Sequence, residues 1–459
     1  MSLRAKLFDL WMKKRPKTLS PMKIIAVVFA GIILLGALLL TLPAASRSGV
    51  SCGFRPALFT ATSATCVTGL VLYDTYTQWS GFGQLVIISL IQIGGLGFMS
   101  AATMFIFFLR KRIGLKQRLV MAQALSISDM DGIVHLQKTV LKGSFAIEGI
   151  GAAILFVRFL PEYGFVQALK WGVFHSISAF CNAGFDIFGC ITPGASLMEF
   201  RSDPVVLLTL GALVIVGGLG FLVWKDLAEH RAFHKCSVYT RLVLVTTLGL
   251  LVIGWAVICL LEWNNPDTLG SMSVVDKLLN GFFQSVTLRT AGFAAIDQAL
   301  LTDSGKAASM ILMLVGGSSG STAGGLKTVT FVVLLLFLAA RARGRSTVCV
   351  YKRTIPQSQV LDAMTLASLM MGMAYVGAIF ISATSPVLFI DALFESVSAL
   401  ATVGLTAGAT GDLSIAAQFL IIVYMYFGRV GMLTISLGFL SGDRAEERFR
   451  YAQTNLLIG

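Results

Sequence analysis

The chain reads Phe-Gln-Ser-Val-Thr-Leu-Arg-Thr-Ala-Gly from Phe283 to Gly292, where a short apolar segment ends in a glycine turn. The same arrangement occurs four times, at intervals of about 110 residues. In each unit, the glycine turn and the short segment before it lie between two longer apolar stretches. The four turns are Cys66-Val67-Thr68-Gly69, Cys181-Asn182-Ala183-Gly184, Arg289-Thr290-Ala291-Gly292 and Ala401-Thr402-Val403-Gly404. We therefore expect four tandem units that share one local structure.

The composition indicates an integral membrane protein. Of the 459 residues, 56% are hydrophobic and only 13% are charged, and the mean hydropathy is +0.82. Apolar stretches long enough to cross roughly 30 Å of hydrocarbon cover residues 22–43, 83–109, 138–160, 204–224, 240–261, 306–339, 359–381 and 414–440. Shorter segments, at 56–66, 170–181, 276–289 and 390–401, end at the glycine turns and are expected to be re-entrant half-helices.

The net charge of +13 is explained by orientation in a membrane. Basic residues gather at alternate ends of the apolar stretches, for example at 13–15, 110–112 and 341–345. The positive-inside rule then places these loops and both termini in the cytoplasm, with the glycine turns open to the outer side. Nucleic acid is accordingly not an expected partner.

The repeats define the expected organisation of the chain. It consists of a cytoplasmic N-terminus (1–21), unit one (22–115), a cytoplasmic amphipathic linker (116–136), unit two (137–230), unit three with a broken second helix (231–345), unit four (346–440) and a cytoplasmic tail (441–459). Since no cytoplasmic segment is long enough to fold a regulatory domain, regulation is expected from another chain.

Each expected half-helix carries a phenylalanine followed by small and hydroxyl residues, as in Phe59-Thr60-Ala61-Thr62-Ser63. Such residues allow close packing around an axis, and the negative carboxyl ends of the half-helices favour a cation there. Glycine permits the positive φ that turns backbone carbonyls inward to replace the water shell of the ion. We predict an all-α membrane protein with the four units arranged pseudo-four-fold around one central pore. Its predicted selectivity filter consists of Gly69, Gly184, Gly292 and Gly404, with Val67, Thr68, Asn182, Ala183, Thr290, Ala291, Thr402 and Val403 supplying carbonyls.

The second apolar stretches of units three and four predict a gate. Residues 316–325 are too rich in glycine and hydroxyl groups to remain helical, and irregular backbone at membrane depth is tolerated where it lines a water-filled cavity. Arg429 stands where the other units have glycine, and a charge there costs at least about 2.5 to 3.5 kcal/mol. The predicted gate is Gly316, Gly317, Ser318, Ser319, Gly320, Ser321, Thr322, Ala323, Gly324, Gly325 and Arg429. The alternative is that Arg429 only ties helices together, and Lys327 is expected to extend to the cytoplasmic interface.

Other chemistries find little support in the sequence. Gly317-Ser318-Ser319-Gly320 matches the serine motif of rhomboid-type intramembrane proteases, a distant alternative, but the required histidine should follow the serine and all four histidines precede it. The near match of residues 320–328 to a phosphate loop has Leu326 where lysine is required. The seven cysteines form no metal-binding cluster. We expect neither an enzyme nor a resident cofactor.

The four glycine turns, the Gly/Ser segment of unit three and Phe427-Gly428-Arg429-Val430-Gly431 together resemble the Ktr/Trk/HKT superfamily of potassium transporters. The resemblance covers the chain from about residue 20 onward and is strongest to the KtrB-type membrane subunits.

This resemblance implies potassium uptake across a bacterial cell membrane. It also implies a homodimer with one pore per chain, which sits on a cytoplasmic KtrA-like ring that binds adenine nucleotides. Relatives with serine in place of the first filter glycine tend to pass sodium, so Gly69 favours potassium. Sodium stays open as an activating or coupled ion, and a sodium-translocating or sodium-coupled carrier of the same architecture is the alternative. The basic loops and the tail are expected to contact the ring or membrane lipids.

Overall fold

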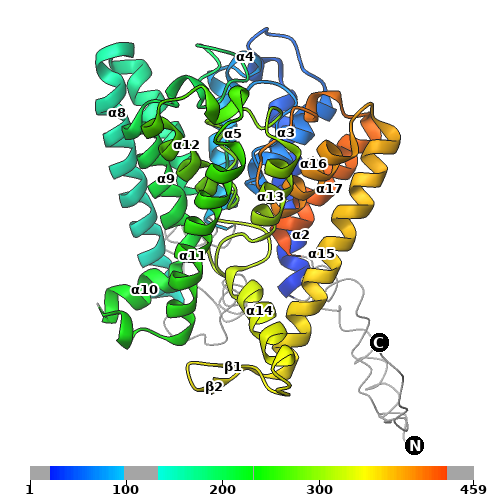
Figure 1. Cartoon of the computed structure of the whole chain (residues 1–459). Coiled ribbons are helices and arrows are strands. Elements are labelled where there is room, and N and C mark those ends of the chain that lie inside the picture. Colours follow the sequence, from blue (N-terminus) through cyan, green and yellow to red (C-terminus); the bar gives the residue numbers. More distant parts are fainter. Residues whose placement is uncertain (1–20, 98–132, 231, 432–459) are drawn as a thin grey trace, which may run out of the picture.

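The computed structural model describes residues 21–97, 133–230 and 232–431 of the chain. Within these ranges the fold is helical, apart from one small hairpin of two strands (Figure 1). The helices of units one and two are α2 (Pro21–Thr41), α3 (Phe54–Cys66), α4 (Thr75–Gln78), α5 (Gly81–Gly95), α8 (Ile133–Phe180), α9 (Pro204–Leu219) and α10 (Phe221–His230). Those of units three and four are α11 (Val238–Glu262), α12 (Val274–Thr287), α13 (Asp303–Leu314), α14 (Thr328–Ala342), α15 (Gln357–Thr384), α16 (Phe389–Ala401) and α17 (Ile415–Val430).

The expected N-terminal segment and C-terminal tail lie almost entirely outside the described residues. So does the linker at 116–136, apart from its last four residues, where α8 already begins. The antiparallel hairpin joins β1 (Cys349–Val350) to β2 (Arg353–Thr354) and follows α14.

Four helices of the described ranges are long and apolar enough to cross a membrane, and five if α9 and α10 are taken as one bent span. In each of the four, no more than 33% of the apolar window is buried within the protein. Large apolar side chains such as Leu35, Leu248 and Val376 are 61%, 65% and 65% exposed. Outward-facing apolar surface on this scale is stable against lipid rather than water.

The half-helices show the opposite distribution, because they lie inside the bundle. Ten of the thirteen residues of α3 and nine of the thirteen residues of α16 are buried. The third half-helix is α12, and the second forms the end of α8, beyond a break where Gly164 has φ of 73°. Each packs against the long helix that precedes it, and in three of them a serine, Ser176, Ser285 or Ser396, donates a hydrogen bond to a backbone carbonyl of that helix.

The second apolar stretch of unit two is interrupted, whereas the sequence predicted an uninterrupted span there. The corresponding stretches of units one and four continue beyond the described residues, which end at Gly97 and Gly431. Helix α5 ends at Gly95, α9 at Leu219 and α17 at Val430, and the glycines that follow them, Gly97, Gly220 and Gly431, have positive φ. At Gly220 the chain bends by 89° into α10. The cause is local, because a glycine adopts the positive φ that ends a helix, while the segment around it stays predominantly apolar.

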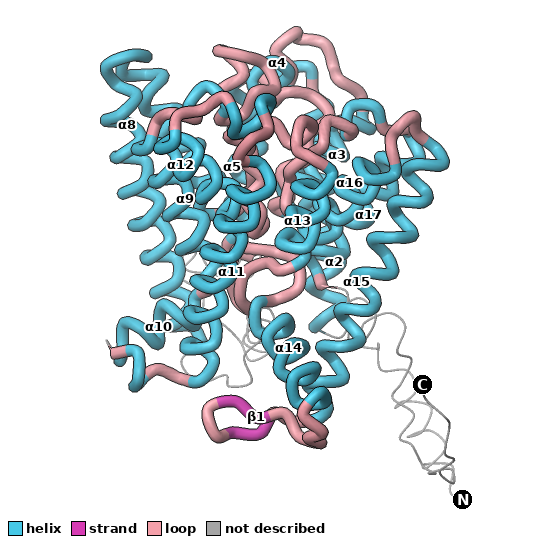
Figure 2. Tube along the Cα trace, in the orientation of Figure 1, coloured by secondary structure: helices cyan, strands magenta, loops and turns pink. Residues whose placement is uncertain are grey.

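In unit three the interruption is a complete loop. Residues 315–327 separate α13 from α14, and Figure 2 shows this loop at mid-height among the helices. The buried core is divided mainly between one cluster formed by units one and two and another that joins units three and four.

Candidate functional site

The four glycine turns follow directly on the carboxyl ends of the four half-helices and come together inside the bundle. Gly69, Gly184, Gly292 and Gly404 have φ values of 102°, 69°, 82° and 92°. These values are in a region that residues with a Cβ rarely adopt. The predicted turn residues are thus brought to one place, in the same backbone conformation.

Contacts between the turns follow a closed cycle. A Cβ built on Gly69 would lie 2.6 Å from the carbonyl oxygen of Ala183, and one on Gly184 would lie 2.8 Å from that of Ala291. A Cβ on Gly292 would lie 2.7 Å from the carbonyl oxygen of Val403. A Cβ on Gly404 would collide with the carbonyl oxygen of Thr68. Each glycine therefore faces the carbonyl before the glycine of the next turn, and no side chain fits at any of the four.

The first of the three predicted filter residues in each turn is also left-handed, although none is glycine. Val67, Asn182, Thr290 and Thr402 have φ values of 56°, 59°, 64° and 53°. The middle residues Thr68, Ala183, Ala291 and Val403 are not in this region. Three of the four left-handed residues are β-branched, the side-chain type for which a positive φ is a true outlier.

A hydroxyl group of each half-helix holds the turn that follows it. Ser63 and Ser398 accept hydrogen bonds from the N–H of Gly69 and Gly404, at 3.0 and 3.1 Å. The corresponding hydroxyls of Ser178 and Thr287 donate instead to the carbonyls of Phe185 and Phe293, both at 2.7 Å. The four hydroxyl residues occupy the same position in the repeated sequence pattern, so their placement follows from the pattern.

The predicted gating loop lies next to the start of these turns, at the carboxyl ends of the half-helices. Thr322 donates to the side-chain oxygen of Asn182 at 3.2 Å, and a Cβ on Gly324 would lie 3.0 Å from the carbonyl oxygen of Ala401. The loop also receives support from unit two, because Ser318 N–H donates to the carbonyl of Gly218 at 3.0 Å.

Arg429 joins this loop to unit one. Its guanidinium donates to the carbonyls of Thr322 and Gly94, and to that of Gly95 at 3.0 Å. Of these three carbonyls, one belongs to the third unit and two belong to the first, whereas Arg429 itself belongs to the fourth. Arg429 therefore connects α17 to the end of α5 and to the gating loop. Such a connection is the role that the sequence left as the alternative.

Lys327 differs from its sequence prediction. Its Nζ turns back and donates to the carbonyl of Ala323 at 2.8 Å, inside the loop, rather than extending along α14 away from it. The loop carbonyl is the nearer acceptor because Lys327 directly precedes the first residue of α14.

Sequence reasoning assigned no side-chain role to Arg289. This residue follows α12 closely and is only 8% exposed. It donates to the carbonyl of Gly316 at 3.0 Å, at the beginning of the gating loop. The available signal was its place in the repeat, where the other units have Cys66, Cys181 and Ala401.

The protease alternative finds no support in the geometry. The hydroxyl of Ser318 donates to the carbonyl of Leu219. His175 is held elsewhere, between the carbonyl of Trp171 and the N–H of Ile187. Among the described residues, no histidine contacts Ser318.

The fold defines an all-α, multi-pass membrane protein whose interior contains short buried helices that end in glycine turns. The profile of the TrkH family, described as "Cation transport protein", matches residues 12–447. The chain therefore belongs to the TrkH family of cation transport proteins, and it is a transporter rather than an enzyme.

Two relatives are similar over nearly their whole length. The potassium/sodium uptake protein NtpJ of Enterococcus hirae is 40% identical over 98% of this chain and 99% of its own. The Ktr system potassium uptake protein B of Bacillus subtilis is 39% identical over 94% and 95%. The crystal structure of the potassium transporter TrkH from Vibrio parahaemolyticus has the same fold, with a TM-score of 0.73 at 19% identity, covering 93% of this chain and 87% of that one.

Proposed function

We propose that this chain is the ion-translocating subunit of a Ktr-like potassium uptake system. The observation that carries the proposal is the closed cycle of four glycine turns, each facing a carbonyl of the next. A cycle of this kind is what four repeats arranged pseudo-four-fold around one central pore would produce.

The turns have the chemistry of a selectivity filter. Their backbone carbonyls are the oxygens that can replace the hydration shell of a monovalent cation, and the half-helices end in the negative pole of the helix dipole. Alternating left-handed and ordinary residues turn successive carbonyls to one side. The proposed filter is Val67-Thr68-Gly69, Asn182-Ala183-Gly184, Thr290-Ala291-Gly292 and Thr402-Val403-Gly404.

Polar side chains at the inner end of this filter support a hydrated path. Asn182 Nδ2, Thr290 Oγ1 and Thr402 Oγ1 are buried and have no hydrogen-bond partner in the described protein. Buried polar groups are normally satisfied, so all three atoms are suited to water, and the two threonine oxygens also to a passing cation.

Residues 316–325 and Arg429 form the proposed gate. The loop contacts the turns directly, and Arg429 brings a positive charge to the same level through its bonds to Thr322 and Gly95. A cation leaving the filter would have to pass both, so displacement of the loop and its arginine would open the pore.

The assembly follows from the names of the relatives and the resemblance. A "Ktr system" protein implies further subunits, and we propose a homodimer that binds a cytoplasmic KtrA-like ring carrying adenine nucleotide. The domain boundaries given above, cytoplasmic termini and a bacterial cell membrane location belong to the same proposal.

Sodium is the second candidate ion, because the relative from Enterococcus hirae is named for both potassium and sodium. Gly69 in the first turn favours potassium. Sodium as a coupled or activating ion remains within the proposal.

The filter is tested by Gly292→Ser, expressed with a nucleotide-binding partner in cells that lack their own potassium importers. The intact chain should restore growth at low potassium. The variant should lose potassium uptake or potassium preference over sodium, because its Cβ would meet the carbonyl of Val403 at 2.7 Å.

The matched control is Gly372→Ser, on a helix face where a Cβ meets nothing within 4 Å. Normal selectivity in Gly292→Ser would contradict the filter. If the intact chain transported sodium and no potassium, sodium would replace potassium as the proposed substrate.

The gate is tested by Arg429→Ala in the same cells. Removing the bonds to Thr322 and Gly95 should release the loop and raise potassium flux per folded protein. An unchanged flux at equal amounts of folded protein would leave Arg429 with the tying role alone.

A further inference from the structure

The gating loop has a neck, which we define as residues 314–317 and 326–328. Gly316 N–H donates to the carbonyl of Leu326 at 2.9 Å, and Leu326 N–H donates to that of Leu314 at 3.0 Å. Thr328 N–H donates to the carbonyl of Gly317 at 3.0 Å. These three backbone bonds close residues 318–325 into a loop that leaves and rejoins the helix direction at one place.

Arg289 binds both sides of this neck. Its Nη2 donates to the carbonyl of Gly316 at 3.0 Å and reaches the hydroxyl of Thr328 at 3.4 Å. The hydroxyl of Thr328 also donates to the carbonyl of Gly316 at 3.1 Å. One guanidinium thus joins Gly316, on the incoming side of the neck, to Thr328, the first residue of α14.

Arg289 also connects the neck to the proposed filter, because Thr290 follows it in the chain and is the left-handed first residue of the third turn. The other units have cysteine or alanine at this position, and their sequences have no counterpart of the Gly/Ser-rich segment 316–325. The long cation therefore occurs in the unit whose second apolar stretch contains that segment.

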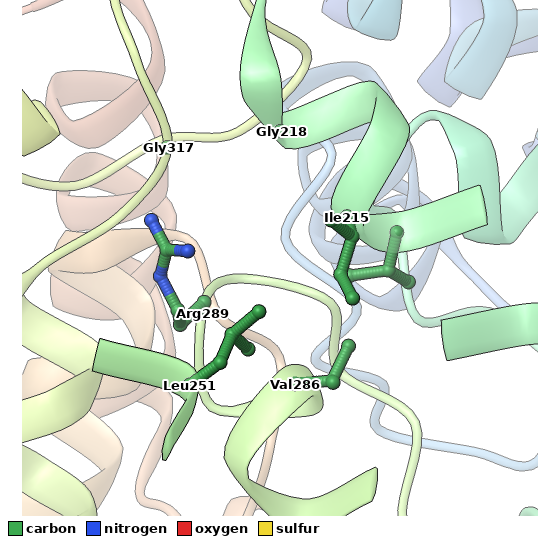
Figure 3. A pocket seen from close by; sticks show the side chains of 7 residues that line it. Ile215, Gly218, Leu251, Val286, Arg289 and Gly317 are labelled. Atoms are coloured by element: carbon green, nitrogen blue, oxygen red, sulfur yellow. The ribbon is translucent and has the colours of Figure 1, made fainter. Parts of the chain in front are cut away.

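Beyond the neck, the surroundings of Arg289 are mainly apolar. A small cavity of about 10 Å³, enough for roughly one water molecule, lies beside Arg289 and is lined by apolar side chains including Val214, Leu251 and Val286. Figure 3 shows the guanidinium directed towards the segment of Gly317, with Leu251 and Val286 near its stem. Its Nε has no partner, and no carboxylate of the described residues forms an ion pair with it.

We infer that Arg289 is a positioning residue of the gate, which holds the neck closed and makes the loop position depend on the third filter turn. The inference rests on the proposed function for its meaning in transport. If the loop moved away, the carbonyl of Gly316 would leave the guanidinium, and a buried charge among apolar side chains would lose its acceptor. The hydrogen bond between Arg289 and Gly316 therefore stabilises the closed position of the loop relative to a displaced one.

The neck is tested first by amide hydrogen exchange in the purified full chain, which needs no transport. Arg289→Met keeps most of the side-chain volume and removes the charge and its bonds. Exchange of the amides of Gly316, Leu326 and Thr328 should become about tenfold faster, the change expected from losing a charge-assisted hydrogen bond. Amides in the middle of α11 should keep their rates.

Thr328→Val provides a second variant in case Arg289→Met does not fold, since it keeps the charge and removes one hydroxyl. It should accelerate the same three amides to a smaller degree. The matched controls are Arg201→Met and Thr365→Val, because Arg201 is exposed and the Thr365 hydroxyl bonds only to its own helix.

Potassium uptake per folded protein is the second readout and should rise in Arg289→Met, while Arg289→Lys, which retains a cation, should restore part of the closed behaviour. Unchanged exchange at the neck, or uniformly faster exchange over the chain, would overturn the inference. If the neck alone is accelerated while the intact chain transports no potassium, the positioning role stands and the proposed function fails.

Discussion

At the scale of single residues, the turns depend on atoms that no hydropathy profile reports. The sequence pattern predicts which glycines meet, because pattern and spacing recur together. It does not predict that the hydroxyls divide into two kinds, with Ser63 and Ser398 accepting from a glycine N–H and Thr287 donating to a carbonyl. That choice depends on which backbone group of the folded turn lies within reach of each hydroxyl, and the repeated pattern is the same in both cases.

Removal of one such hydroxyl should weaken the filter without unfolding the protein. In Ser398→Ala the buried N–H of Gly404 loses its acceptor, at a cost of about 1–3 kcal/mol. We expect reduced preference for potassium over sodium in uptake measured with both ions, at nearly normal amounts of folded protein.

The control for this change is Ser89→Ala, whose exposed hydroxyl bonds only to the carbonyl of Leu85 in its own helix. Equal selectivity of Ser398→Ala and the control variant would show that the hydroxyl has no part in ion discrimination.

At the scale of elements, each half-helix is fitted to the long helix before it. A Cβ on Gly151 or Gly377 would lie 2.7 or 2.5 Å from the hydroxyl of Ser176 or Ser396, and Gly254 faces Ser285 in the same way. The sequence predicted the half-helices from their lengths and endings, and the structure has helices there. The sequence did not predict the contacts of these glycines, because a glycine in an apolar helix gives the same sequence pattern whether it faces lipid or another helix.

The docking contact predicts different outcomes for two substitutions in the same helix. Gly254→Val should displace α12, because its side chain would overlap Ser285, and should strongly reduce the amount of folded protein. Gly249→Val should be tolerated, since a Cβ there meets nothing within 4 Å. Size-exclusion chromatography in detergent measures both, and equal yields would contradict the close packing.

At the scale of the whole molecule, the units are joined by polar contacts at long sequence separation. Lys306 on α13 pairs with Asp391 on α16 at 2.7 Å, with side chains 9% and 15% exposed. Arg429 joins units one, three and four. Neither pairing could be predicted from the sequence, because partners 85 or more residues apart carry no local signal. The overall class could be predicted, since composition and repeat spacing constrain it.

The ion pair between units three and four should contribute to stability. Lys306→Met leaves the carboxylate of Asp391 without its partner, and breaking a buried pair in this way costs about 3–5 kcal/mol. The melting temperature in detergent should fall, and the exchange Lys306→Asp with Asp391→Lys should recover part of it.

For comparison, Lys225→Met removes an exposed pair with Glu229, whose side chains are 52% and 57% exposed, and should have almost no effect. An equal decrease in melting temperature in both variants would show that the buried pair of Lys306 and Asp391 contributes no more to stability than the exposed pair.

The left-handed conformation of Val67, Thr290 and Thr402 implies that thermal stability and ion selectivity oppose each other in this protein. A non-glycine residue held in this conformation costs of order 1–3 kcal/mol, so Asn or Gly at these positions should raise the melting temperature of the protein. Selection for thermostability alone should therefore favour substitutions at these three positions. The resulting thermostable variants should transport ions less selectively. For Thr290→Asn, the melting temperature measures stability, and uptake of potassium in competition with sodium measures selectivity. A variant with an unchanged melting temperature and unchanged selectivity would argue against backbone strain at the turns.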